Sequence, residues 1–186
     1  MVKVRIRASV RSLAAGLIFW LLASGSALAV PCDIEAGEVP LFMCETDPPG
    51  HFLSICAVEV KPGEEWSEVQ YRYSSDDAIE FVYPEEFSEG VAQNLLFSHA
   101  VGPEGYVVSI HFVADGTRFR LTSTAKSETE GHAEMMIENT PRPSMTKISC
   151  GERPTIFPDY LRRALACDPE SPDGAAGCAE TPPGHP

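Results

Sequence analysis

The chain has 186 residues, with 14 Lys and Arg against 27 Asp and Glu, which gives a formal net charge of −13. A surface of this sign repels nucleic acid and anionic lipid headgroups, so we expect neither as a partner. The length predicts one domain, with a hydrophobic core large enough that folding does not depend on disulfides.

The first 29 residues have the order of a secretory signal peptide. They open with four basic residues, Lys3, Arg5, Arg7 and Arg11. An apolar run from Leu13 to Leu22 follows, and Ala27-Leu28-Ala29 ends the segment with small residues around a leucine. The apolar run is about half of the roughly 20 residues that span a bilayer, which disfavours a membrane anchor. We predict cleavage after Ala29, a periplasmic or secreted location, and no stable membrane insertion after cleavage.

Cleavage would make the protein more acidic. Ten Lys and Arg would then face 27 Asp and Glu, a formal charge of −17. The acids concentrate between Glu59 and Glu89, and the candidate acidic surface consists of Glu64, Glu65, Glu68, Asp76, Asp77, Glu80, Glu85, Glu86 and Glu89. Such a surface attracts cationic partners. The alternative is that it serves solubility alone.

An even number of cysteines in an exported chain predicts three disulfides. The six are Cys32, Cys44, Cys56, Cys150, Cys167 and Cys178. We expect Cys167 to pair with Cys178 across a short loop rich in Pro and Gly. Among the others, Cys44–Cys150 would join the first strand to the last, whereas Cys44–Cys56 would close a hairpin, and the sequence does not choose. A zinc site is disfavoured, because there is no C-x-x-C pair and no His close to two cysteines.

Alternation of β-branched and aromatic residues with polar ones predicts strands through the middle of the chain. The expected strands are the segment leading into Cys44 and residues 52–60, 68–73, 78–83, 94–100, 106–113, 117–124, 132–138 and 144–150. Between two of them, Asp115-Gly116 supplies the positive φ angles of a two-residue hairpin turn. About eight short strands joined mostly by turns predict an all-β fold, an antiparallel sandwich or barrel.

Helical patterns are few. Residues 84–93 are a weak candidate for a helical turn. Residues 159–166 predict a short C-terminal helix, because Asp159 is placed to cap its start and Leu161 and Leu165 share a face.

The last twenty residues are too rich in Pro and Gly to pack a core. The predicted organisation is a signal peptide over 1–29, a single β domain over 30–166, and a tail over 167–186 closed by a local disulfide. Trp66 falls in a predicted loop, either as an exposed contact residue or as a cap on the end of the sheet.

The chain carries no motif of a common enzyme class: no G-x-S-x-G, no phosphate loop, no G-x-G-x-x-G and no H-E-x-x-H. Its histidines are scattered singly, and the strand pattern places His111, Arg118 and Arg120 on the face away from the core. The carboxylates around Asp76 do not follow a calcium-binding loop. We therefore predict no catalytic, cofactor-binding or metal site.

Several blocks of the sequence resemble those of a group of uncharacterised exported bacterial proteins with the series C-x-T…L-S-V-C…Q-Y-R-Y…V-Y-P…I-S-C…C-D…G-C. The blocks are Phe42-Met43-Cys44-Glu45-Thr46, Leu53-Ser54-Ile55-Cys56, Val69-Gln70-Tyr71-Arg72-Tyr73, Ile79-Glu80-Phe81-Val82-Tyr83-Pro84, Ile148-Ser149-Cys150 and Cys167-Asp168…Gly177-Cys178. The resemblance implies an envelope β protein and assigns no catalytic residue. Cys32 falls outside the shared pattern.

A fainter similarity is to the periplasmic barrel inhibitors of c-type lysozyme, which also join an early cysteine to a late one. Their S-G-x-x-Y segment has no counterpart here. The favoured hypothesis is a non-enzymatic binding protein that uses its acidic surface toward a basic protein such as a lysozyme. The alternatives are a structural or assembly component of the cell envelope, and a secreted hydrolase without a recognisable motif, whose pocket would hold shifted titratable groups.

Overall fold

The computed structural model describes residues 31–87, 92–102, 105–125, 131–139, 144–151 and 154–171. The predicted signal peptide, Glu89 and Cys178 lie outside these ranges. The described chain is mostly β-structure with one short helix, which confirms the predicted all-β class.

All nine predicted strands are present, and two short ones near the C-terminus were not predicted. The strands are β1 (Glu38–Asp47), β2 (His51–Lys61), β3 (Glu65–Ser75), β4 (Ile79–Tyr83), β5 (Ala92–Gly102), β6 (Gly105–Ala114), β7 (Thr117–Ala125), β8 (Gly131–Asn139), β9 (Ser144–Cys150), β10 (Thr155–Ile156) and β11 (Leu165–Cys167). The helix α1 spans Pro158–Ala164. The count is therefore eleven rather than about eight.

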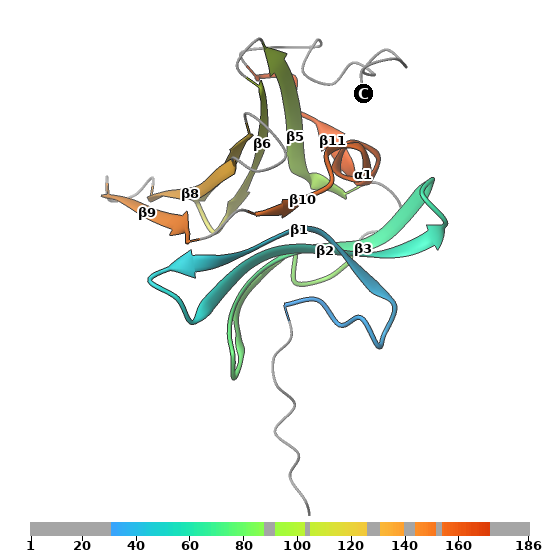
Figure 1. The fold of residues 1–186 in the computed structure, drawn as a ribbon, viewed down its shortest axis with the longest axis horizontal. Coiled ribbons are helices and arrows are strands. Elements are labelled where there is room, and N and C mark those ends of the chain that lie inside the picture. The colour runs from blue at the N-terminus through green and yellow to red at the C-terminus, as the bar shows by residue number, and fades with distance from the viewer. Residues whose placement is uncertain are drawn as a thin grey trace, which may run out of the picture.

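The strands form a single sheet with the order β11-β5-β6-β7-β8-β9-β1-β2-β3-β4, and β10 pairs with β1. Neighbours are antiparallel except β11, which runs parallel to β5. The sheet is curled into a half-barrel, so that β1–β3 form a lower layer and β5 and β6 rise above it, with α1 beside β5 and β11 (Figure 1). Because β4 and β11 end the order without pairing to each other, the sheet stays open.

Aromatic rings from the two layers meet inside the curl. The ring of Phe112 on β6 lies 5.1 Å from that of Tyr71 on β3 and 4.7 Å from that of Tyr83 on β4. Phe119 on β7 stacks on both Phe112 and Phe81. Neighbouring members on one strand occupy alternate positions, so their side chains lie on the same face of the sheet and join one core.

The predicted hairpin turn is confirmed. Asp115 and Gly116 have φ angles of 49° and 73° and join β6 to β7. Two consecutive positive φ angles match the twist of the flanking strands, and Asp-Gly adopts them at low cost.

One predicted disulfide alternative is present and the other is wrong. Cys44 pairs with Cys150, whereas Cys56 pairs with Cys32. In the β1–β2 register Cys44 lies opposite Leu53 and Cys56 lies opposite Pro40, so Cys44 and Cys56 are separated along the hairpin. Cys167 is also disulfide-bonded, and Cys178, its predicted partner, is outside the described residues. These bonds indicate an oxidising, extracytoplasmic location.

The C-terminal helix is shorter than predicted. It ends at Ala164 instead of Ala166, because residues 165–167 form β11, and Phe157 rather than Asp159 stands at its start, with no side-chain cap. The Asp159 carboxylate instead accepts a hydrogen bond from Arg162 at 3.0 Å. Trp66 lies within β3, only 3% exposed, with its ring 5.0 Å from that of Tyr160. It therefore packs the end of the sheet against α1 and is not an exposed contact residue.

Candidate functional site

The first candidate site is the acidic half of the sheet, which we define as residues 31–87 with strands β1–β4. It carries 14 Asp and Glu but only two cations, Lys61 and Arg72. The described residues from 92 to 171 carry six Asp and Glu against five Arg and Lys. The charge of the described chain is therefore concentrated in one half of the curled sheet.

One of the two cations does not contribute to the surface of this half. Arg72 is only 8% exposed, and its guanidinium bonds to both carboxylate oxygens of Glu38 at 2.5 and 2.7 Å. Its other contacts include the side-chain oxygen of Gln70. The other 13 acids of this half are exposed, so Lys61 is the one cation facing them among residues 31–87.

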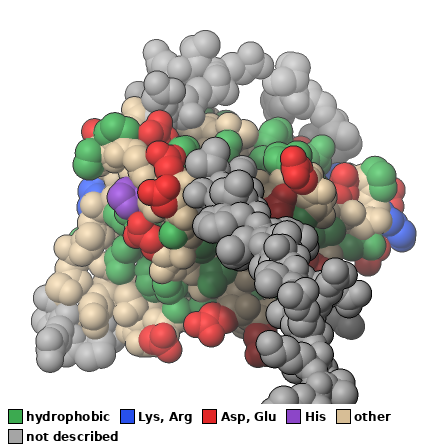
Figure 2. Space-filling model, turned by 90° about the horizontal axis from the view of Figure 1, so that it is seen from below, with side chains coloured by type: hydrophobic (Ala, Val, Ile, Leu, Met, Phe, Trp, Pro, Cys, Tyr) green, Lys and Arg blue, Asp and Glu red, His purple; other side chains and the backbone are tan. Residues whose placement is uncertain are grey.

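Nine of the 13 exposed acids lie around three places in this half. Some surround the tip of the β2–β3 hairpin, some form the turn before β4, and some lie on β4 or directly after it. Of the predicted acidic surface, the described members are Glu64, Glu65, Glu68, Asp76, Asp77, Glu80, Glu85 and Glu86, and all are exposed. Figure 2, which views the molecule from the side of this half, shows acidic side chains recurring across the face and basic ones only at its margins.

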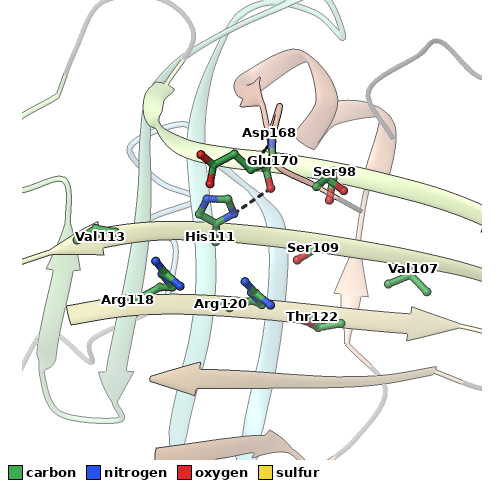
Figure 3. A pocket seen from close by; sticks show the side chains of 11 residues that line it. Ser98, Val107, Ser109, His111, Val113, Arg118, Arg120, Thr122, Asp168 and Glu170 are labelled. Carbon is green, nitrogen blue, oxygen red and sulfur yellow. Dashed lines mark hydrogen bonds and ion pairs between the residues drawn. The ribbon is translucent and has the colours of Figure 1, made fainter. Parts of the chain in front are cut away.

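The second candidate site is a groove of about 470 Å³ on the outer face of β5–β7. Its floor consists of the outward residues of β6, namely Val107, Ser109, His111 and Val113. The flanks come from Ser98 on β5 and from Arg118, Arg120 and Thr122 on β7, and the segment after β11 adds Asp168, Glu170 and Ser171. Figure 3 shows these side chains grouped on one face of the strands.

Asp168 holds the C-terminal segment against the groove. Its backbone N–H donates to the Phe97 carbonyl at 2.8 Å, and its Oδ1 accepts the backbone N–H of Glu170 at 2.9 Å. Its Oδ2 lies 3.1 Å from Nδ1 of His111 (Figure 3). Both oxygens of this buried carboxylate are therefore engaged, and His111 is held with Nδ1 toward Asp168.

The groove does not contain the contact that a serine nucleophile needs. Ser98 and Ser109 line it, but within the described part of the chain His111 bonds only to Asp168. A nucleophile requires a base within hydrogen-bond reach. The geometry therefore supplies charged and hydroxyl groups for binding, without a serine–histidine pair.

The sequence analysis predicted the outward orientation of some groove residues but did not predict the groove. Strand alternation put His111, Arg118 and Arg120 on the outer face, and all three line the groove. The missing part was Asp168, which belonged to the predicted tail. No periodic signal marks the segment 168–171, and only the fold brings it beside β5 and β6.

His99 lies on β5 near α1 and is half-buried. Burial, and next the positive charge of Arg162, lower the pKa of His99, while Asp159 opposes the shift. Its Nε2 is buried with no hydrogen-bond partner in the described structure. The folded protein therefore favours the neutral imidazole.

This shift predicts a pH dependence of stability. Below the unfolded-state pKa of about 6.5, the unfolded chain binds a proton that folded His99 resists, so stability falls as the pH decreases. We expect the free energy of unfolding of the wild type, relative to His99→Gln, to decrease from pH 8 to pH 5.5 in urea titrations. A difference that stays constant with pH would contradict the assignment.

Comparisons with protein-family models, curated proteins and solved structures gave no match. The resemblance to exported bacterial proteins therefore stays a prediction. Over the described ranges, no three His, Cys, Asp or Glu side chains gather as a metal site. No helix in those ranges has the length and apolar character to cross a membrane.

Proposed function

We propose that this is a non-enzymatic, periplasmic or secreted binding protein, and that its acidic half binds a cationic protein such as a lysozyme. The observation that carries the proposal is the separation of charge between the two halves of the sheet. Thirteen exposed acids share one half with a single exposed cation, Lys61, whereas the described residues of the other half are close to neutral.

Separated charge acts on association in a way that evenly spread charge does not. It orients the molecule in the field of a cationic partner and raises the association rate. Solubility alone would be served equally by acids on both halves. The proposed contact region is the part of the acidic half around β4, where Asp76 and Asp77 precede the strand and Glu85 and Glu86 follow it.

The four carboxylates around β4 give a direct test. None of them has an ion-pair partner among the described residues, so their neutralisation leaves the fold intact. We expect the variant Asp76→Asn, Asp77→Asn, Glu85→Gln, Glu86→Gln to bind hen egg-white lysozyme at least about tenfold more weakly in 25 mM salt, because several exposed charges each contribute a few tenths of a kcal/mol. Biolayer interferometry on the mature protein would measure this.

A matched variant separates local from total charge. Neutralising Asp115, Glu138, Asp159 and Glu170 changes the net charge by the same amount in the other half, and we expect it to alter the affinity by less than about twofold. Wild-type binding should weaken in 300 mM salt, and turbidity assays should show lysozyme inhibition at low salt. Equal effects of the two variants would reject the acidic half as the contact. Absence of both salt-sensitive binding and inhibition would reject the proposal.

A further inference from the structure

Arg120 differs from the other cations in the described part of the chain. Within the described ranges, Lys61, Arg72, Arg118, Lys147, Arg162 and Arg163 each contact a carboxylate or a backbone carbonyl. Arg120 has no such partner there, although acids outnumber bases over the same residues. Its side chain lines the groove on β5–β7.

The surroundings of Arg120 keep it free for a ligand. The nearest buried carboxylate, that of Asp168, has both oxygens engaged by His111 and by the turn at Glu170. His111 lies directly opposite Arg120 in the β6–β7 register. Nδ1 of His111 faces Asp168, and His111 lines the same groove as Arg120.

Arg118 adds a second cation to the side of the groove formed by β7. It lies two residues before Arg120 and therefore on the same face of β7. Its contact with Glu138 is long, 3.8 Å, and both side chains are at least half exposed. A guanidinium with free donors matches the planar, two-oxygen geometry of a carboxylate or the oxygens of a phosphate.

A row of three hydroxyl groups lies beside Arg118 and Arg120. Ser98 pairs with Ser109 across β5 and β6, and Ser109 pairs with Thr122 across β6 and β7. The row that contains His111 and Arg120 is the next one on the same face, two residues along each strand, or about 7 Å away. Figure 3 shows the two rows side by side.

We propose that this groove binds a small polyhydroxylated anion, a sugar that carries a carboxylate or a phosphate. The oxyanion bonds to Arg120, with Arg118 adding positive charge, and the sugar hydroxyls bond to Ser98, Ser109 and Thr122. The groove volume of about 470 Å³ is within the range of small-molecule sites. Glu170, on the opposite rim, opposes the anion and limits its affinity. This site lies outside the acidic half and is independent of the function proposed above.

Isothermal titration calorimetry of the mature protein in low salt tests the proposal with three probes. These are glucuronate, glucose 6-phosphate, and glucose as the uncharged match. We expect one or both anions to bind and glucose not to bind. Binding of glucuronate alone identifies a carboxylate site, and binding of glucose 6-phosphate alone identifies a phosphate site.

Three variants then locate the binding. Arg120→Met should weaken binding of the anion at least about tenfold, as expected for a charge-assisted pair. Glu170→Gln should strengthen it, and Arg163→Met, an exposed arginine near the β2–β3 turn, should not change it. Circular dichroism checks that each variant is folded. The proposal is overturned if neither anion binds, if glucose binds equally well, or if Arg120→Met binds like the wild type.

Discussion

Replacing Arg72 by methionine is expected to lower the free energy of unfolding by about 3–5 kcal/mol, because it leaves the buried carboxylate of Glu38 without its counter-charge. The pair is bidentate, with both distances at or below 2.7 Å. Glu38 also accepts the backbone N–H of Asp33 at 2.6 Å. The loss would therefore loosen the N-terminal segment from the outer face of β2 and β3 as well.

Two further variants separate this cause from the loss of a long side chain. Arg72→Met combined with Glu38→Gln removes both charges and keeps an acceptor for Asp33, so it should recover more than about 1 kcal/mol relative to the single variant. Arg118→Met makes the same change in an exposed pair and should cost less than about 1 kcal/mol. Urea unfolding at pH 7 measures all three. A double variant no more stable than Arg72→Met would show that charge is not the cause.

The position of Arg72 shows what sequence patterns cannot predict. Alternation along β3 puts Tyr71 on one face and Gln70 and Arg72 on the other, and in the structure Tyr71 lies in the core while Arg72 contacts Gln70 and Glu38. It could not show that residues 31–37 cover that face, because this segment has no periodicity and reaches β3 from more than 30 residues away. Contacts of this kind depend on tertiary structure, which a local pattern does not encode.

Strand prediction depends on a repeated two-residue period. It therefore works for long strands and misses short ones, including the one that leads into the groove. Nine strands were long enough to repeat their two-residue period, whereas β10 and β11, with two and three residues, were too short to show one. The short strand β11 leads directly into Asp168, which completes the groove. His111 and Arg120 were therefore predicted to be exposed without any indication that they share a site.

Removal of the Cys44–Cys150 disulfide is the other change with a large expected effect. The bond closes a sequence separation of 106 residues, compared with 24 for Cys32–Cys56. Loop-closure entropy predicts a larger stabilisation for the longer loop, about 4–5 kcal/mol against about 3 kcal/mol. The double variant Cys44→Ala, Cys150→Ala should therefore be less stable than Cys32→Ala, Cys56→Ala.

The location of Cys44–Cys150 strengthens this expectation. β1 and β9 join the two halves of the sheet, yet only the pairs Thr46–Cys150 and Asp47–Ser149 form between them. Because so few backbone pairs join β1 to β9, the disulfide is the covalent link that holds these two strands together. Urea unfolding should rank the two variants, and hydrogen exchange in the less stable one should rise first at β1 and β9. If the shorter loop proves the more important, or if exchange rises first in the β2–β3 hairpin, the junction is not the weak point of the curled sheet.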